Sequence, residues 1–147
     1  MLVLTFQIGD NRLALDIRRV REVVPRVELK RSPTGPTWLA GLFVYRGQAV
    51  PVVDLHRLLG GGECPPHLSS RIILVPRVDA EGTESLLGLL AAQVADLREV
   101  EPGLTPGLGG TPGLGSPLVD RDGIIHLLDL DRLIPPSESG PLLAGRA

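Results

Sequence analysis

Hydrophobic and polar residues alternate at the start of the chain. Residues 2–8 place an apolar side chain at every second position, the two-residue period of a strand with one buried face. After a turn, the alternation resumes over residues 12–16, so the first 16 residues predict a hairpin. Ile17, Val20 and the valines that follow are spaced at helical intervals instead, which predicts a short helical turn capped by Asp16 and ending before the next proline.

Short strands separated by glycine and proline continue along the chain. Strands are predicted over residues 26–31, 41–45, 48–53, 71–76 and 124–128, with one long bent strand or two shorter ones over residues 86–100. Asp54 follows an apolar strand, so we expect it to cap a helical turn over residues 55–59 that exposes His56. A loop is predicted over residues 103–117, where Thr-Pro-Gly-Leu-Gly occurs twice.

One segment occurs twice at a distance of 75 residues. Residues 46–59 and residues 121–134 both run from a turn through an apolar strand and an aspartate into a helical turn, and both end in apolar-apolar-Asp-Leu-x-Arg-Leu-aliphatic. The repeat predicts two similarly built halves of roughly 70 residues, a size at which small barrels close on themselves. Because neither half is large enough to be very stable alone, we expect them to share a core.

Composition excludes several classes of protein. Eighteen glycines and fourteen prolines among 147 residues exclude long helices, and a single cysteine excludes an internal disulfide. A net charge of −2 gives no overall field for nucleic acid or an anionic membrane. No basic segment precedes an apolar run at Met1, and no apolar run could span a bilayer, so we expect a cytoplasmic protein. One part of the chain departs from this charge balance, a basic cluster that comprises Arg18, Arg19, Arg21, Arg26, Lys30 and Arg31. Such a cluster could bind phosphates, but more often it is a solvated surface or a surface that faces an acidic partner.

The chain shows no arrangement of residues typical of catalysis. Its three histidines lie far apart, and Cys64 and His67 have the spacing of two zinc ligands without a second cysteine to complete a structural site. Phosphate-binding glycine motifs are missing, and four aromatic residues are few for stacking on a single strand of nucleic acid. We therefore expect no metal, no cofactor and no enzyme, and protein binding becomes the leading class; a small-barrel enzyme or ligand binder is the alternative class.

Four motifs follow one another in the first 55 residues, at Phe6–Asp10, Val20–Val23, Trp38–Phe43 and Arg46–Leu55. With Leu87–Leu90, Val94 and Leu127–Leu130 further along, they resemble the CheW domain of bacterial chemotaxis coupling proteins. The resemblance implies an all-β fold of two five-stranded, SH3-like antiparallel barrels with short helical turns. We expect a single domain over residues 1–136, made of two barrel subdomains, and a flexible tail over residues 137–147.

The function that the resemblance implies is that of a non-enzymatic adaptor. Such proteins couple the cytoplasmic tip of a methyl-accepting chemoreceptor to the regulatory domain of a CheA-type histidine kinase. We expect no nucleic-acid partner and no direct membrane insertion, but recruitment to membrane receptor arrays. The alternative is an adaptor of a non-motility chemosensory pathway, or one that sequesters receptors without activating a kinase.

Site residues also follow from the resemblance. Arg46, in an Arg-Gly turn, is the position most closely tied to kinase control, and Val20 and Glu22 fall where the family meets its partners. Val44 stands two residues before the Arg-Gly pair, where the family usually has asparagine, and we count it with the partner-binding residues. A purely structural role is the alternative for two of these residues. Arg46 could be an ordinary turn arginine, and Val20 could belong to the core. Two glycines carry structural roles in this prediction: a positive φ at Gly47 and close packing at Gly41.

Overall fold

The computed structural model describes residues 1–31, 34–60, 62, 64–65, 70–78, 81–95, 97–102 and 114–134. Its strands are β1 (Leu2–Ile8), β2 (Asn11–Asp16), β3 (Glu22–Pro25), β4 (Leu39–Tyr45), β5 (Gln48–Asp54), β6 (Arg71–Val78), β7 (Glu84–Ala91), β8 (Leu97–Glu99), β9 (Glu101–Pro102), β10 (Leu114–Asp120) and β11 (Gly123–Leu128). The helical elements are one 3-10 turn, η1 (Ile17–Arg19), and two short helices, α1 (Leu55–Leu58) and α2 (Leu130–Leu133). Within the described residues, no helix has the length and apolar character needed to cross a membrane.

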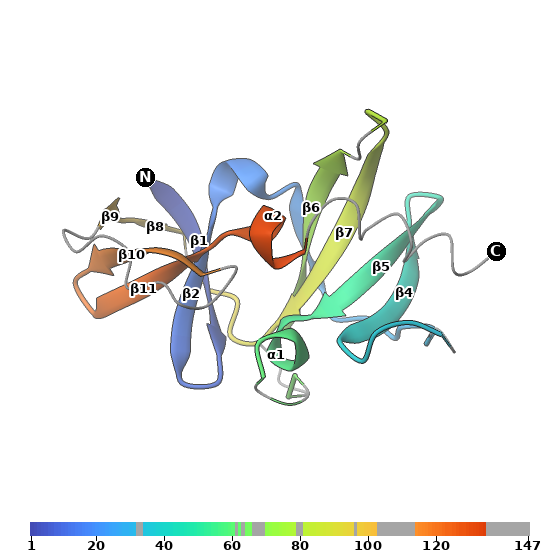
Figure 1. Ribbon diagram of the computed structural model, residues 1–147, viewed down its shortest axis with the longest axis horizontal. Helices are drawn as coiled ribbons and strands as arrows, with labels where there is room; N and C mark the ends of the chain where they lie inside the picture. The colour runs from blue at the N-terminus through green and yellow to red at the C-terminus, as the bar shows by residue number, and fades with distance from the viewer. Residues whose placement is uncertain are drawn as a thin grey trace.

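The strands form two sheets that lie beside one another with α2 between them (Figure 1). One sheet has the order β8-β1-β2-β11-β10-β9, and we call it the first barrel. The other has the order β3-β6-β7-β5-β4, and we call it the second barrel. Neighbouring strands are antiparallel except for one parallel pair in each sheet, β2 with β11 and β5 with β7.

A bent stretch of chain joins the two edges of each sheet. In the first barrel, β8 and β9 are separated only by Val100, whose amide donates a 2.9 Å hydrogen bond to the carbonyl of Met1. In the second barrel, the chain leaves β3 and reaches β4 at the opposite edge, where Lys30 and Leu42 exchange two backbone hydrogen bonds of 2.8 and 2.9 Å. With β8 and β9 taken as one bent strand, each sheet has five strands and curls on itself. The predicted fold class is confirmed.

The repeated segment is a repeated structural unit. Its first copy forms the β4–β5 turn, β5, the cap residue Asp54 and α1, and its second copy forms the β10–β11 turn, β11, the cap residue Asp129 and α2. The repeat alone predicted that the two barrels would be successive halves of the chain. They are not. The hairpin β1–β2 pairs with β11 and takes the place that β6–β7 takes beside β5, so the first barrel combines both ends of the described chain.

Three hydrophobic clusters fill the molecule. Val3, Ala14, Val100, Leu118 and Ile125 lie inside the first barrel. Val50, Val52, Cys64, Ile72, Leu74, Leu86, Leu90 and Ala92 lie inside the second. The shared core between the barrels is the largest and contains Leu4, Phe6, Ile8, Leu13, Leu15, Val53, Leu55, Ile73, Val75, Leu87, Leu89, Ala91, Leu128, Leu130 and Ile134.

The central strands are therefore buried on both faces, which corrects the one-sided pattern predicted for β1. Leu4 and Phe6 face the shared core, while the alternating residues Val3 and Thr5 are also buried. Val3 belongs to the interior of the first barrel, so a strand that appears amphipathic in sequence lies between two apolar layers.

Several predicted elements differ in the structure. The helical turn after Asp16 is only η1, because Val23 and Val24 instead extend as β3 and pair with Ile73 and Ile72 of β6. Residues 26–31 form no regular ladder and contact β4 through Lys30. The predicted loop over 103–117 is shorter, since β10 begins at Leu114. Residues 103–113 and the predicted tail over 137–147 lie outside the described residues.

His56 is buried, against the prediction that it would be exposed on its turn. The carboxylate of Asp54 accepts hydrogen bonds from the amides of His56 (2.9 Å), Arg57 (3.4 Å) and Cys64 (2.9 Å), which confirms the predicted cap and ties α1 to the chain that follows it. This arrangement leaves His56 only 4% exposed, with Nε2 accepting a 3.3 Å hydrogen bond from the amide of Ala92. Burial lowers the pKa of His56 below its ordinary value, because the neutral ring is favoured there.

We expect Gly41→Ala to destabilise the fold more than Gly123→Ala, because only the first substitution places a Cβ against neighbouring backbone. Gly41 has φ +150°, and a Cβ built there would lie 2.8 Å from the backbone oxygen of Lys30. Backbone strain and forced displacement together cost about 4 kcal/mol. Gly123 has φ +123° with no atom within 4 Å of such a Cβ, so Gly123→Ala reports strain alone, about 2 kcal/mol. Urea unfolding of both variants measures the difference, and equal losses would contradict the close approach at Gly41.

We expect acid to destabilise the protein through His56. The unfolded chain takes up a proton near pH 6.5, whereas the buried ring resists it, so stability present above that pH is lost as the pH falls toward the lowered pKa of the folded state. The slope reaches at most about 1.4 kcal/mol per pH unit for one proton. Unfolding free energies between pH 7.5 and 5 measure it. His56→Gln is expected to flatten this dependence and His126→Gln to preserve it; an unchanged slope in His56→Gln would assign the effect elsewhere.

Candidate partner-binding surface

The turn between β4 and β5 holds Arg46 in an exposed position. Tyr45 pairs with Gln48, so Arg46 and Gly47 alone form the turn. Both have positive φ, 48° at Arg46 and 77° at Gly47, as in the two-residue turns that match the twist of a hairpin. The arginine side chain is 78% exposed at this tip.

Glu22 and Tyr45 lie beside the guanidinium group of Arg46. The Tyr45 hydroxyl donates a hydrogen bond to the Glu22 carboxylate, and Arg46 Nη2 lies 3.9 Å from the same carboxylate oxygen. The Arg46 guanidinium carbon also lies 5.1 Å from the centroid of the Tyr45 ring, within cation–π range. The hydrogen bond to Glu22 raises the pKa of Tyr45, because ionisation would place two negative oxygens together.

The four predicted partner-binding residues do not form a single exposed patch. Arg46 and Glu22 are brought together, and Val44 lies on the same hairpin with 73% of its surface exposed. Val20 follows η1, is only partly exposed and packs against the shared core. Sequence reasoning missed Tyr45 as the residue that links Glu22 to Arg46, although its place directly before the Arg-Gly turn was a signal.

The two glycines singled out in the sequence lie at different kinds of position. Gly47 completes the turn in the left-handed region with open space around it. Gly41 lies where the backbone at Leu29 and Lys30 crosses β4, and a Cβ there would also approach the Leu29 Cβ to 2.9 Å. This crossing is the contact that joins the two edges of the second barrel.

The residues that the sequence offers for catalysis or metal binding do not gather in the described part of the chain. Cys64 is 1% exposed and packs inside the second barrel. Its predicted neighbour His67 lies outside the described residues. Among the residues that are described, no three histidine, cysteine or acidic side chains gather as metal ligands would.

Comparison with known proteins places the chain in a family. The family model described as the CheW-like domain matches residues 2–138. The chain belongs to the CheW-like domain family. Within it, the chain is 26% identical over 147 residues to a probable chemotaxis protein CheW of Rhizobium etli, covering 93% of this chain and 89% of that protein. It is 32% identical over 108 residues to protein FrzA of Myxococcus xanthus, covering 71% and 64%.

A solved member of the CheW-like family has the same fold. The crystal structure of the scaffolding protein TtCheW from Thermoanaerobacter tengcongensis superposes with a TM-score of 0.75, at 26% identity over 91% of this chain and 92% of that one. The family consists of chemotaxis scaffold and adaptor proteins, which is the coarse functional class expected from the sequence.

We expect the single tyrosine of this CheW-like chain to report on the surface around Arg46. Because the chain contains one tyrosine, phenolate absorbance during an alkaline titration belongs to Tyr45 alone. Its midpoint is expected above the ordinary value of 10.0, and Glu22→Gln is expected to bring it down, since the charged acceptor is removed. Glu28→Gln is the control and should leave the midpoint unchanged. A midpoint that Glu22→Gln does not move would contradict the contact.

Proposed function

We propose that this protein couples the cytoplasmic tip of a chemoreceptor to the regulatory domain of a CheA-type histidine kinase, without catalysing a reaction itself. The observation that carries the proposal is the exposed arginine at the β4–β5 turn, held by Tyr45 and Glu22 and flanked by exposed Val44. A charged group beside an exposed apolar side chain suits a protein interface, where arginine pairs with carboxylates through two parallel hydrogen bonds.

The tips of the two repeated units differ in a way that suits separate contacts. On the β10–β11 hairpin, Val119 and Ile124 pair across the strands and are 50% and 63% exposed. They occupy the places that Val44 and Ala49 hold on β4–β5. The second tip is therefore more apolar, and Arg121 and Asp122 replace Arg46 and Gly47 in its turn. We assign kinase binding to the Arg46 tip, with Arg46, Glu22 and Val44 in the contact.

Val20 is assigned a supporting role in this proposal. It packs against the shared core two residues before Glu22, so it holds the start of β3 against the barrel junction. Individual contacts of such an adaptor can stay weak, because many copies in an array add their contributions through effective concentration.

We expect Arg46→Glu to keep the fold and lose kinase binding. The side chain is exposed and its described partners, Glu22 and Tyr45, are themselves partly exposed, so thermal unfolding should change little, while reversing its charge replaces attraction to an acidic partner by repulsion. Titration calorimetry against the regulatory domain of a CheA-type kinase from the same genome measures the effect. Wild-type binding is expected near micromolar Kd, about −8 kcal/mol, and the variant at least about tenfold weaker.

Arg121→Glu is the matched control, since Arg121 holds the corresponding place in the second unit. An equal loss in both variants would indicate a general charge effect and remove the role assigned to Arg46. Receptor binding by a wild-type protein that binds no kinase would favour the alternative, an adaptor that sequesters receptors without activating a kinase.

A further inference from the structure

The basic cluster that stands out in the sequence divides into two groups. Three members of the cluster form ion pairs with acids. Arg18 lies 2.7 Å from Asp16, Arg19 lies 3.1 Å from Asp131, and Arg21 lies 2.9 Å from Glu84. Neither Arg26 nor Arg31 forms an ion pair with any acid in the described part of the chain. Arg26 donates a 2.8 Å hydrogen bond to the carbonyl of Pro65 instead. With Lys30, which forms no ion pair in the described part of the chain either, three cations of the cluster have no carboxylate partner among the described residues.

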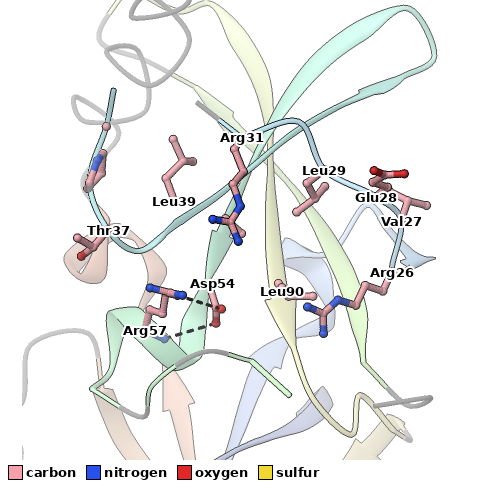
Figure 2. A pocket seen from close by; sticks show the side chains of 13 residues that line it. Arg26, Val27, Glu28, Leu29, Arg31, Thr37, Leu39, Asp54, Arg57 and Leu90 are labelled. Atoms are coloured by element: carbon pink, nitrogen blue, oxygen red, sulfur yellow. Dashed lines mark hydrogen bonds and ion pairs between the residues drawn. The ribbon is translucent and has the colours of Figure 1, made fainter. Parts of the chain in front are cut away.

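Arg26 and Arg31 line one pocket of ≈ 450 Å³ together with a third arginine, Arg57 of α1. Figure 2 shows the three guanidinium groups entering this pocket from different sides, Arg31 from the bent segment above and Arg57 from the helix below. Like charges facing one cavity repel one another, so the arrangement favours an anion between them.

The two acids that line the pocket, Asp54 and Glu28, form no ion pair with Arg26 or Arg31. Asp54 is 2% exposed, and its oxygens accept three backbone hydrogen bonds in addition to lying 3.9 Å from Arg57 Nε. Its carboxylate therefore offsets one arginine at most. Glu28 also lines the pocket, but Figure 2 shows its carboxylate turned away from Arg31 and Arg57.

The remaining lining is partly apolar and leaves room for more than a bare ion. Leu29, Leu39, Leu90 and Pro36 contribute to the walls. A volume of this size is in the range of sites for small organic ligands. Guanidinium groups bind carboxylate and phosphate oxygens in pairs, which gives geometric selectivity for groups that carry several acidic oxygens.

We propose that this pocket binds a ligand with two or more negatively charged oxygens, a phosphomonoester or a polycarboxylate, through Arg26, Arg31 and Arg57. The site lies at the opposite end of the β4–β5 hairpin from Arg46, beside Leu39 and Asp54 rather than the turn. It does not depend on the proposed kinase contact. The group can reach the pocket on a free small molecule or on acidic side chains of a peptide, and the chemistry of recognition is the same.

The test is a calorimetric titration of the whole chain at constant ionic strength with inorganic phosphate, citrate and a triglutamate peptide, and with acetate as the monovalent comparison. Arg31→Gln removes one pocket charge, and no hydrogen bond or ion pair of the described residues is lost with it. Arg18→Gln is the control, since it makes the same change of charge at a side chain that is 84% exposed and paired with Asp16.

We expect saturable binding of at least one polyvalent anion, much weaker binding of acetate, and a Kd about tenfold higher in Arg31→Gln than in Arg18→Gln. Phosphate alone would identify a phosphomonoester ligand, citrate a small polycarboxylate, and the peptide alone a protein source of carboxylates. Absence of saturable binding to all three, or equal affinity in the two variants, would overturn the proposal.

Discussion

Packing between the two barrels is the interaction on which the rest of the structure depends. Among the described residues, fifteen buried side chains form the shared core, six from strands of the first barrel, six from strands of the second and three from α1, α2 and the residue after α2, whereas five lie inside the first barrel. A barrel with so small an interior buries too little apolar surface to offset its chain entropy, so it needs the layer outside it. Removing the second barrel would expose Leu4, Phe6 and Leu13 together.

A buried cation crosses the same junction. Arg77 of β6 is 3% exposed; its Nη2 donates to the carbonyl of Ile134, after α2, and its Nε lies 3.9 Å from Asp131. Its Nη1 has no hydrogen-bond partner among the described residues, and burial lowers the pKa of the group. Such a pair adds little net stability because desolvation offsets the attraction, but its directed contacts specify which part of α2 lies against β6. Apolar packing thus supplies the association, and Arg77 helps to set its register.

The β4–β5 hairpin carries the features of functional interest at its two ends. At the turn, positive φ at Arg46 and Gly47 projects a cation into solvent, and Tyr45 and Glu22 hold it. At the other end, Asp54 caps α1 and brings Arg57 to the pocket. A strand pair of seven residues each separates them, so the proposed partner contact and the proposed anion site do not overlap.

Local patterns in the sequence determined much of this protein. The two-residue period predicted short strands, the aspartates predicted caps for the helical turns, and short motifs such as Trp38–Phe43 and Arg46–Leu55 carried the resemblance to the CheW domain. Each of these patterns reflects interactions between residues a few positions apart, so it can be recognised in the sequence alone. Tertiary structure alone decided that β1–β2 joins β11, that His56 is buried against Ala92, that Tyr45 meets Glu22, and that Arg57 meets Arg26 and Arg31. Each of these depends on pairing between segments distant in the chain, where many partners are equally apolar, and only the complete packing of both barrels selects among them.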